Sequence, residues 1–160
     1  MLISKELNDA INEQIGHEFE ASHQYLQIAA YFDSKALKGT AKLFTKQSEE
    51  EREHGMKFVK YIMETGGELK VPAIPAGKTS FASAEEAVKY ALDWEWEVTR
   101  RINALMDLAI KQNDHLGREF LGWFVSEQLE EISHMDSLLR IVKQAGEKNL
   151  MMLEAYISHE

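Results

Sequence analysis

The 160-residue chain contains no cysteine and only two prolines. Without cysteine it can form no disulfide, no thiolate metal site and no cysteine nucleophile, which fits a reducing compartment such as the cytoplasm. It also has no run of the roughly 18 apolar residues that span a membrane. The N-terminal segment MLISKELNDAINEQ is amphipathic rather than continuously apolar, unlike a signal peptide. We therefore expect a cytoplasmic location and no membrane partner.

Basic residues are also few. The chain has 18 Lys and Arg against 27 Asp and Glu, which gives a formal net charge of -9. Proteins that bind nucleic acids usually present Lys and Arg to the phosphates, so we expect no nucleic-acid partner. A surface with this excess of acidic groups can instead concentrate cations near the protein.

What the chain does contain is long segments with helical periodicity and recognisable start signals. Ser4 is a candidate N-cap for the first segment. Ser83-x-x-Glu86 has the form of a capping box at the start of the third. Asn113 or Asp114 could cap the fourth. Helices are therefore predicted at about residues 5–33, 38–65, 83–112, 115–144 and 147–157.

The segment between the second and third helices, GGELKVPAIPAGKTSFAS, holds both prolines and has no helical period. Helices of roughly 28 residues are about 42 Å long. A chain that returns along the whole length of a bundle needs a long connection of this kind. The sequence therefore predicts an all-α fold in a single domain over residues 1–160. A four-helix bundle occupies about residues 5–144, with a long crossover between helices 2 and 3, and a short fifth helix follows at about 147–157.

Polar residues interrupt the face of each long helix that should be buried. This face is otherwise apolar or small, and its interruptions are Glu18 in the first helix, Glu51 in the second, Glu95 in the third, and Gln128 and Glu131 in the fourth. A buried carboxylate without a partner is strongly disfavoured. Four carboxylates in one core are reasonable if they share cations, so the pattern predicts a metal site inside the bundle.

The two halves of the chain repeat this arrangement. A step of 33 residues separates Glu18 from Glu51, and the same step separates Glu95 from Gln128. Three residues beyond each pair stands another ligand-type side chain, His54 in the first half and Glu131 in the second. Residues three apart share one helix face. A Glu from each of two helices plus a Glu-x-x-His type pair from each of the other two is the pattern of bundles that bind two metal ions.

A second assignment is possible in the third and fourth helices. Glu131-Ile-Ser-His134 is itself a Glu-x-x-His pair, so Glu97 and His134 could replace Glu95 and Gln128 as ligands. The helical period favours Glu95 with Gln128, because Glu95 continues the apolar face while Glu97 lies on its flank.

Counting charges favours iron as the metal. The four glutamates at the face supply four negative charges, which match two divalent ions. Carboxylates with a little imidazole suit iron or manganese better than copper or a closed structural zinc site. Gln128 is a neutral and weaker ligand, so one of the two ions should be held more loosely.

Four segments carry a resemblance to a known family: NEQIGHEFEASHQYL, EEEREH, LDWEWEVTRRIN and LGWFVSEQLEE. Together they resemble the non-haem ferritins of bacteria and archaea over essentially the whole chain, within the ferritin-like di-iron superfamily. The resemblance implies a ferroxidase centre of two irons per subunit at Glu18, Glu51, His54, Glu95, Gln128 and Glu131. It also implies that Glu51 bridges the irons and that Glu131 separates them from a third iron position at Glu50, Glu127 and Glu130.

The family resemblance further implies what the protein does. Fe(II) would be oxidised by O2 or H2O2, and the ferric mineral would be stored in a hollow homo-oligomeric shell of about 24 subunits for iron storage and detoxification. Tyr25 matches a tyrosine beside the centre, where it could supply an electron or hydrogen-bond to a ligand carboxylate. Trp123 matches a tryptophan near the centre.

Departures from the family are few. Bacterioferritins bind haem through a methionine directly after the bridging glutamate, and Arg52 stands there in this chain, so no haem is expected. Met56, one turn away, is expected to fill a gap in the packing. Four more side chains have no assigned role beyond packing or surface exposure: His17, His23, Trp94 and Trp96.

The alternative function is a rubrerythrin-like di-iron peroxidase that stores no mineral. Those proteins usually carry a cysteine-rich iron domain, which this chain lacks. A helical assembly protein without metal would not need carboxylates at four matching positions. The related DNA-protecting shells place their metal site between subunits, whereas this ligand set is complete within one chain.

Overall fold

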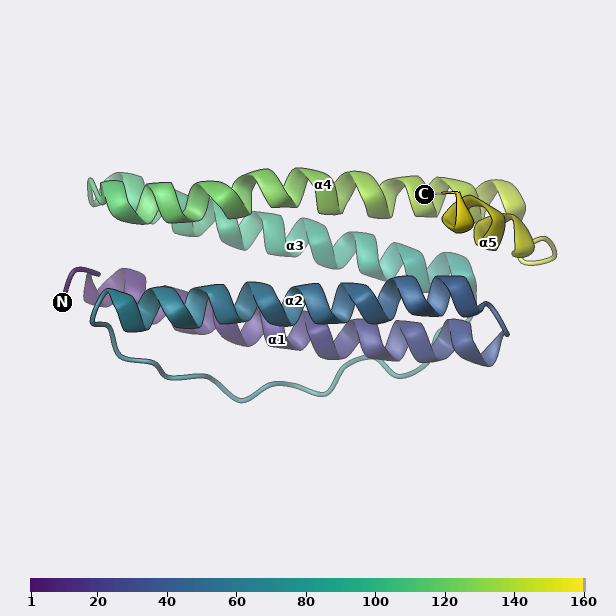
Figure 1. Ribbon diagram of the computed structural model, residues 1–160, viewed down its shortest axis with the longest axis horizontal. Helices are drawn as coiled ribbons and strands as arrows, with labels where there is room; N and C mark the ends of the chain where they lie inside the picture. Colours follow the sequence, from purple (N-terminus) through teal and green to yellow (C-terminus); the bar gives the residue numbers. More distant parts are fainter. Residues whose placement is uncertain (160) are drawn as a thin grey trace.

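The computed structural model describes residues 1–159, which form five helices and no strand (Figure 1). The helices are α1 (Lys5–Ser34), α2 (Lys38–Glu64), α3 (Ala84–Lys111), α4 (His115–Ala145) and α5 (Met151–Ser158). This confirms the predicted all-α fold, a four-helix bundle with a long crossover and a short C-terminal helix. Among the described residues, no helix combines the length and the apolar character needed to cross a membrane.

The four long helices lie roughly along one common axis. Figure 1 shows α1 beside α2 and α3 beside α4, with the crossover running the length of the bundle along the α1–α2 pair. The N-terminus lies at one end of the bundle, and α5 folds back against the other end. Because α2 ends and α3 begins at opposite ends of the bundle, the connection has to be as long as the sequence predicted.

The predicted start signals act at the observed helix starts. The hydroxyl of Ser4 accepts a hydrogen bond from the Leu7 amide at 3.1 Å, and the carboxylate of Asp114 accepts one from the Gly117 amide at 2.8 Å. Ser83 caps α3 as expected. The capping box at Ser83 is incomplete, since the Glu86 carboxylate accepts from the amide of Ala82 rather than from that of Ser83.

Amide side chains of α1 hold the crossover in place. Asn8 donates to the carbonyl of Glu68 at 3.0 Å and accepts from its amide at 3.0 Å. Gln24 forms the same pair of bonds with Lys78, at 3.0 Å and 2.8 Å. A segment without regular structure leaves backbone groups that need partners. These two side chains supply them at two points of the crossover.

Buried apolar side chains form two clusters, one toward each end of the bundle. One cluster includes Ile15, Phe58 and Phe124, and the other includes Phe32 and Phe44. In each long helix, the buried candidate ligands lie between the residues that belong to these two clusters. A polar layer therefore crosses the bundle between two apolar ends, and the candidate ligands lie in that layer.

The fifth helix begins at Met151, four residues later than the predicted start at residue 147. Gly146 ends α4 with φ of 69°, in the left-handed region that glycine adopts easily. The amide of Asn149 then donates to the carbonyl of Gly146 at 3.1 Å, so the chain makes a turn before it becomes helical again. Helix α5 is short, and Leu153 is its buried residue.

The carboxylate of Glu154 joins α5 to the start of α2. It accepts hydrogen bonds from the amides of Gly39 and Thr40, both at 2.8 Å, and from the Thr40 hydroxyl at 2.7 Å. Leu37, at the N-cap position of α2, provides no side-chain cap. Glu154 therefore supplies the acceptor and the negative charge that favour a helix N-terminus, although it lies 115 residues from Gly39 in the sequence.

Replacing Glu154 with alanine should loosen both elements locally. The lost cap is expected to cost about 1–2 kcal/mol, which corresponds to about 5–30-fold faster exchange of the Gly39 and Thr40 amides. Hydrogen exchange followed residue by residue measures this. A matched control is Glu147→Ala, which removes an exposed carboxylate that accepts only at 3.3 Å. Equal exchange rates in the two variants would show that Glu154 does not hold α5 on α2.

Candidate metal centre

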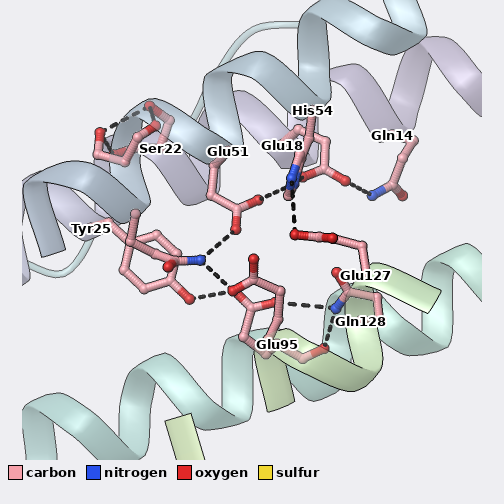
Figure 2. A network of polar contacts seen from close by, with 12 residues as sticks. Gln14, Glu18, Ser22, Tyr25, Glu51, His54, Glu95, Glu127 and Gln128 are labelled. Atoms are coloured by element: carbon pink, nitrogen blue, oxygen red, sulfur yellow. Dashed lines mark hydrogen bonds and ion pairs between the residues drawn. The ribbon is translucent and has the colours of Figure 1, made fainter. Parts of the chain in front are cut away.

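The six predicted ligands of the two-metal centre converge in the polar layer of the bundle. Every one of these side chains is exposed by 5% or less: Glu18, Glu51, His54, Glu95, Gln128 and Glu131. All four long helices contribute, with two residues each from α2 and α4. Figure 2 shows Glu18, Glu51 and His54 pointing across a shared space toward Glu95 and Gln128.

Two overlapping groups of three residues have the geometry of metal sites. In the first triad, Glu18, Glu51 and His54, one ligand atom from each residue lies within 4.8 Å of the others. The second triad, Glu51, Glu95 and Glu131, meets the same limit. Glu51 belongs to both triads. This arrangement suits two neighbouring cations that share one carboxylate.

Two carboxylate oxygens in the first triad are buried without a hydrogen-bond partner, Oε2 of Glu18 and Oε2 of Glu51. The Nδ1 atom of His54 lies 3.3 Å from the second of these and 3.9 Å from the first. An unsatisfied buried carboxylate oxygen is costly. A divalent cation would satisfy both oxygens at once, and this donor set of carboxylates and one imidazole suits iron or manganese.

The carboxylate of Glu95 is held differently, because both of its oxygens accept hydrogen bonds. The hydroxyl of buried Tyr25 donates to Oε1, and Nε2 of Gln128 donates to Oε2 at 3.1 Å. Gln128 Nε2 also lies 3.0 Å from the hydroxyl of Thr99. The amide nitrogen of Gln128 is thus occupied, and its carbonyl oxygen is the atom that could reach a cation. Tyr25 has the hydrogen-bonded placement that was one of its two predicted roles.

Burial changes the proton affinity of the carboxyls in the second triad. It raises the pKa of Glu95 to about 7, although hydrogen bonds from Tyr25 and Gln128 act in the opposite direction. It raises the pKa of Glu131 to about 9, with a further contribution from the charge of Glu95. Burial also raises the pKa of Glu51 well above its usual range. Without a metal, this centre keeps protons at neutral pH that the unfolded chain would release.

Metal binding should therefore release protons. Because the folded pKa values lie above the unfolded ones, the metal-free protein loses stability as pH rises from about 5 to 9, while its affinity for metal rises over the same range. At pH 7, binding of Zn(II) is expected to release about one proton or more per chain. Calorimetric titration in two buffers of different ionisation enthalpy measures this number. Glu131→Gln should release about one proton fewer, and zero release by the unchanged protein would contradict the prediction.

A pocket of about 480 Å³ opens beside the second triad. It is lined by all three residues of the predicted third iron position, Glu50, Glu127 and Glu130, together with Glu131 and His134. Ligand atoms of His54, Glu127 and Glu131 also lie within 4.8 Å of one another, which links the pocket to the centre. His134, a ligand in the alternative assignment, lines this pocket instead.

The alternative ligand Glu97 lies away from the centre. Its carboxylate bonds to the guanidinium groups of Arg100 and Arg101, each at 2.9 Å from the Nε atom. The side chain is exposed by 41%, whereas Glu95 is fully buried. The helical period had favoured Glu95, and the observed burial agrees with that choice. His134 does not join either triad.

The histidines and tryptophans without an assigned role are distributed around the centre. His17 contacts Arg101, and His23 lines a small surface pocket. Trp94 packs beside Tyr90 with its ring nitrogen buried and unpaired, and Trp96 is 57% exposed. These positions suit packing and surface roles.

Trp123 lies at the edge of the centre, as its predicted position near it implied. Its ring centroid is 5.4 Å from that of His54, and the ammonium of Lys57 lies 3.2 Å from the centre of its ring. The tryptophan therefore connects the ligand histidine to an exposed cation on the surface.

Two buried side chains at the centre had no predicted role, Gln14 and Gln47. Gln14 donates to Glu18 at 3.0 Å, and Gln47 donates to Glu51 at 3.2 Å. Each glutamine precedes its glutamate by four residues, a spacing that brings two side chains together on one helix face. That spacing was visible in the sequence, but it also occurs on solvated helix surfaces.

Comparison with known proteins identifies relatives over nearly the whole chain. A family model described as a ferritin-like domain matches residues 8–145. Ferritin BfrB of Mycolicibacterium smegmatis is 40% identical over 150 residues, covering 94% of this chain and 82% of that protein. A bacterial non-heme ferritin of Staphylococcus saprophyticus is 43% identical over 144 residues, covering 88% of this chain and 86% of that protein.

The fold also matches a solved structure. The open pore ferritin of the archaeon Archaeoglobus fulgidus superposes with a TM-score of 0.94 at 32% sequence identity, covering 99% of this chain and 98% of that one. The likeness extends to the crossover and to the C-terminal helix, since almost every residue of both chains is included.

Proposed function

This chain belongs to the ferritin family, and from that premise we propose that it oxidises Fe(II) at the two triads and stores the ferric product. The storage compartment would be a hollow shell of about 24 copies of the chain, in the cytoplasm, and the task would be iron storage and detoxification. The observation that carries the proposal is the pair of triads that share Glu51, with unpaired carboxylate oxygens directed at the first position.

In the proposed ferroxidase reaction, iron is the substrate. One Fe(II) binds at Glu18, Glu51 and His54, and the second binds at Glu51, Glu95 and Glu131, with the carbonyl oxygen of Gln128 as a further ligand. The four glutamates balance the charge of two divalent ions. Each iron loses one electron, and O2 takes up both electrons and two protons to give H2O2. With H2O2 as the oxidant, the same two electrons and two protons would give two molecules of water.

The residues of the centre prepare the reaction in three ways. The raised pKa values of Glu95 and Glu131 mean that these groups carry protons before iron binds and release them as it enters. The hydroxyl of Tyr25 holds Glu95 in place through its hydrogen bond. All six ligands are buried between two apolar clusters, and such a low-dielectric setting strengthens the attraction between the carboxylates and the cations.

We further propose that the product leaves through the pocket beside the second triad. Glu50, Glu127 and Glu130 line this pocket and supply oxygen ligands for a third iron. Glu131 contributes both to the second triad and to the pocket, so it would lie between the second and third positions.

Sedimentation velocity after addition of a large excess of Fe(II) in air tests the storage proposal. The boundary is followed at a protein absorbance and at the ferric absorbance. We expect ferric absorbance to move with a heavy, shell-sized species. A small protein with only a few irons per chain and peroxidase activity would instead support a rubrerythrin-like di-iron enzyme and reject storage.

A further inference from the structure

Two glutamines stand one helical turn before the glutamates of the first triad. Gln14 precedes Glu18 on α1, and Gln47 precedes Glu51 on α2. Both amides are almost completely buried, with exposures of 2% and 4%. In each pair, Nε2 of the glutamine donates to Oε1 of the glutamate, at 3.0 Å for Glu18 and 3.2 Å for Glu51.

These bonds decide which oxygen of each carboxylate is left for a metal. In both glutamates Oε1 is occupied by the amide, and Oε2 is the buried oxygen that has no partner. A carboxylate can rotate about its last bond, and that rotation is broad. A donor on one oxygen restricts the rotation and keeps the other oxygen directed at the space that His54 also faces.

Gln47 makes a second contact that Gln14 does not. Its Nε2 also donates to Oε2 of Glu131 at 2.5 Å, across the bundle from α2 to α4. An amide nitrogen carries two hydrogens, so Gln47 can bond Glu51 and Glu131 at the same time. These are two of the three residues of the second triad. Gln47 therefore fixes the distance between carboxylates from two different helices.

The chemistry of the amide suits this task. Lysine or arginine could hold the same carboxylates, but their positive charge would oppose a cation that enters the site. An amide donates hydrogen bonds and carries no charge, so the four negative charges remain available for the metals. Groups that hold the ligands of a metal site typically change its affinity for metal by about 10–100-fold when they are removed.

We propose that Gln14 and Gln47 are positioning residues whose largest effects fall on different metal positions. Gln14 orients Glu18 of the first triad. Gln47 orients Glu51, which both triads share, and also Glu131 of the second triad, so its larger effect falls on the second position. The inference rests on the proposed function, because it assumes that the triads bind metal. It goes beyond the predicted ligand set, since neither glutamine is itself assigned as a ligand.

The test compares Gln14→Met with Gln47→Met, because methionine keeps the length and packing volume of the side chain and removes the donor. Crystals of each variant and of the unchanged protein are equilibrated at a series of Zn(II) concentrations. Zinc accepts the same oxygen and nitrogen ligands and does not change oxidation state. Anomalous diffraction at the zinc edge then gives the occupancy of the first and second positions separately.

We expect both variants to weaken zinc binding, each mainly at a different position. Gln14→Met should raise the Zn(II) concentration for half occupancy about 10–100-fold at the first position and less at the second. Gln47→Met should have its larger effect at the second position. Equal changes at both positions, or none, would overturn the assignment. If a methionine variant does not fold, Gln→Asn at the same position retains the amide but withdraws it by one methylene, and the same pattern is expected.

Zinc binding by the unchanged protein distinguishes failure of the proposed function from failure of the positioning role. If it binds no zinc at either triad, the proposed function fails. If it fills both positions while the glutamine variants bind as it does, the proposed function stands and the positioning role is rejected.

Discussion

Replacing Glu51 and His54 together with alanine should abolish rapid Fe(II) oxidation while the protein still folds and assembles. Glu51 is the carboxylate that both triads share, and His54 is the imidazole of the first. The double variant therefore leaves the first position with one carboxylate and the second with two. We expect the initial rate of ferric product formation, measured by stopped-flow absorbance, to fall about 100-fold or more.

A matched control for this variant is Glu49→Ala with Glu53→Ala. Both glutamates are exposed on one face of α2, four residues apart, and neither belongs to a triad. The control should oxidise Fe(II) at nearly the unchanged rate. Fast oxidation by the double variant at Glu51 and His54, in a protein that assembles normally, would disprove the location of the centre.

Phe58→Ala is expected to have the largest effect on stability. The ring of Phe58 is fully buried and stacks on Phe124 with 4.1 Å between centroids, and Phe124 in turn lies 6.1 Å from His54. Loss of a buried phenylalanine ring typically costs about 3–5 kcal/mol, because the cavity does not close. For a chain of this size, that cost lowers the melting temperature of the metal-free protein by about 6–20 °C.

Scanning calorimetry of the metal-free protein measures the change. Met63→Ala is the control, since Met63 is on the same helix and is 60% exposed. Substitution at such a surface position usually changes stability by less than about 0.5 kcal/mol. A melting temperature for Phe58→Ala no lower than that of Met63→Ala would show that the stacked rings of Phe58 and Phe124 do not stabilise the bundle.

Helical period made most of the bundle predictable from the sequence. Side chains three and four residues apart lie on one face, so the period alone distinguishes Glu95 from Glu97. The structure buries Glu95 and pairs Glu97 with arginines. The helix starts at Ser4 and Asp114 could also be predicted from the sequence, because a cap depends on only a few neighbouring residues.

Contacts between distant residues were not predictable in the same way. The bond from Gln47 to Glu131 depends on how α2 and α4 are rotated and shifted against each other, which no local pattern specifies. The same holds for Glu154 at the start of α2, and for Asn8 and Gln24 on the crossover. The start of α5 was predicted too early because a short turn after Gly146 has no strong sequence signal.

The crossover connects two helical hairpins, and the two metal positions differ in whether they need both hairpins. Residues of the first triad all come from α1 and α2, whereas the second triad joins α2 to α3 and α4. The molecule is in this sense a tethered dimer of two helical hairpins, and the tether keeps them at a high effective concentration. If a protease cut the crossover, their association would become bimolecular. A metal at the first position would leave that equilibrium nearly unchanged, while a metal at the second would bind the two hairpins to each other.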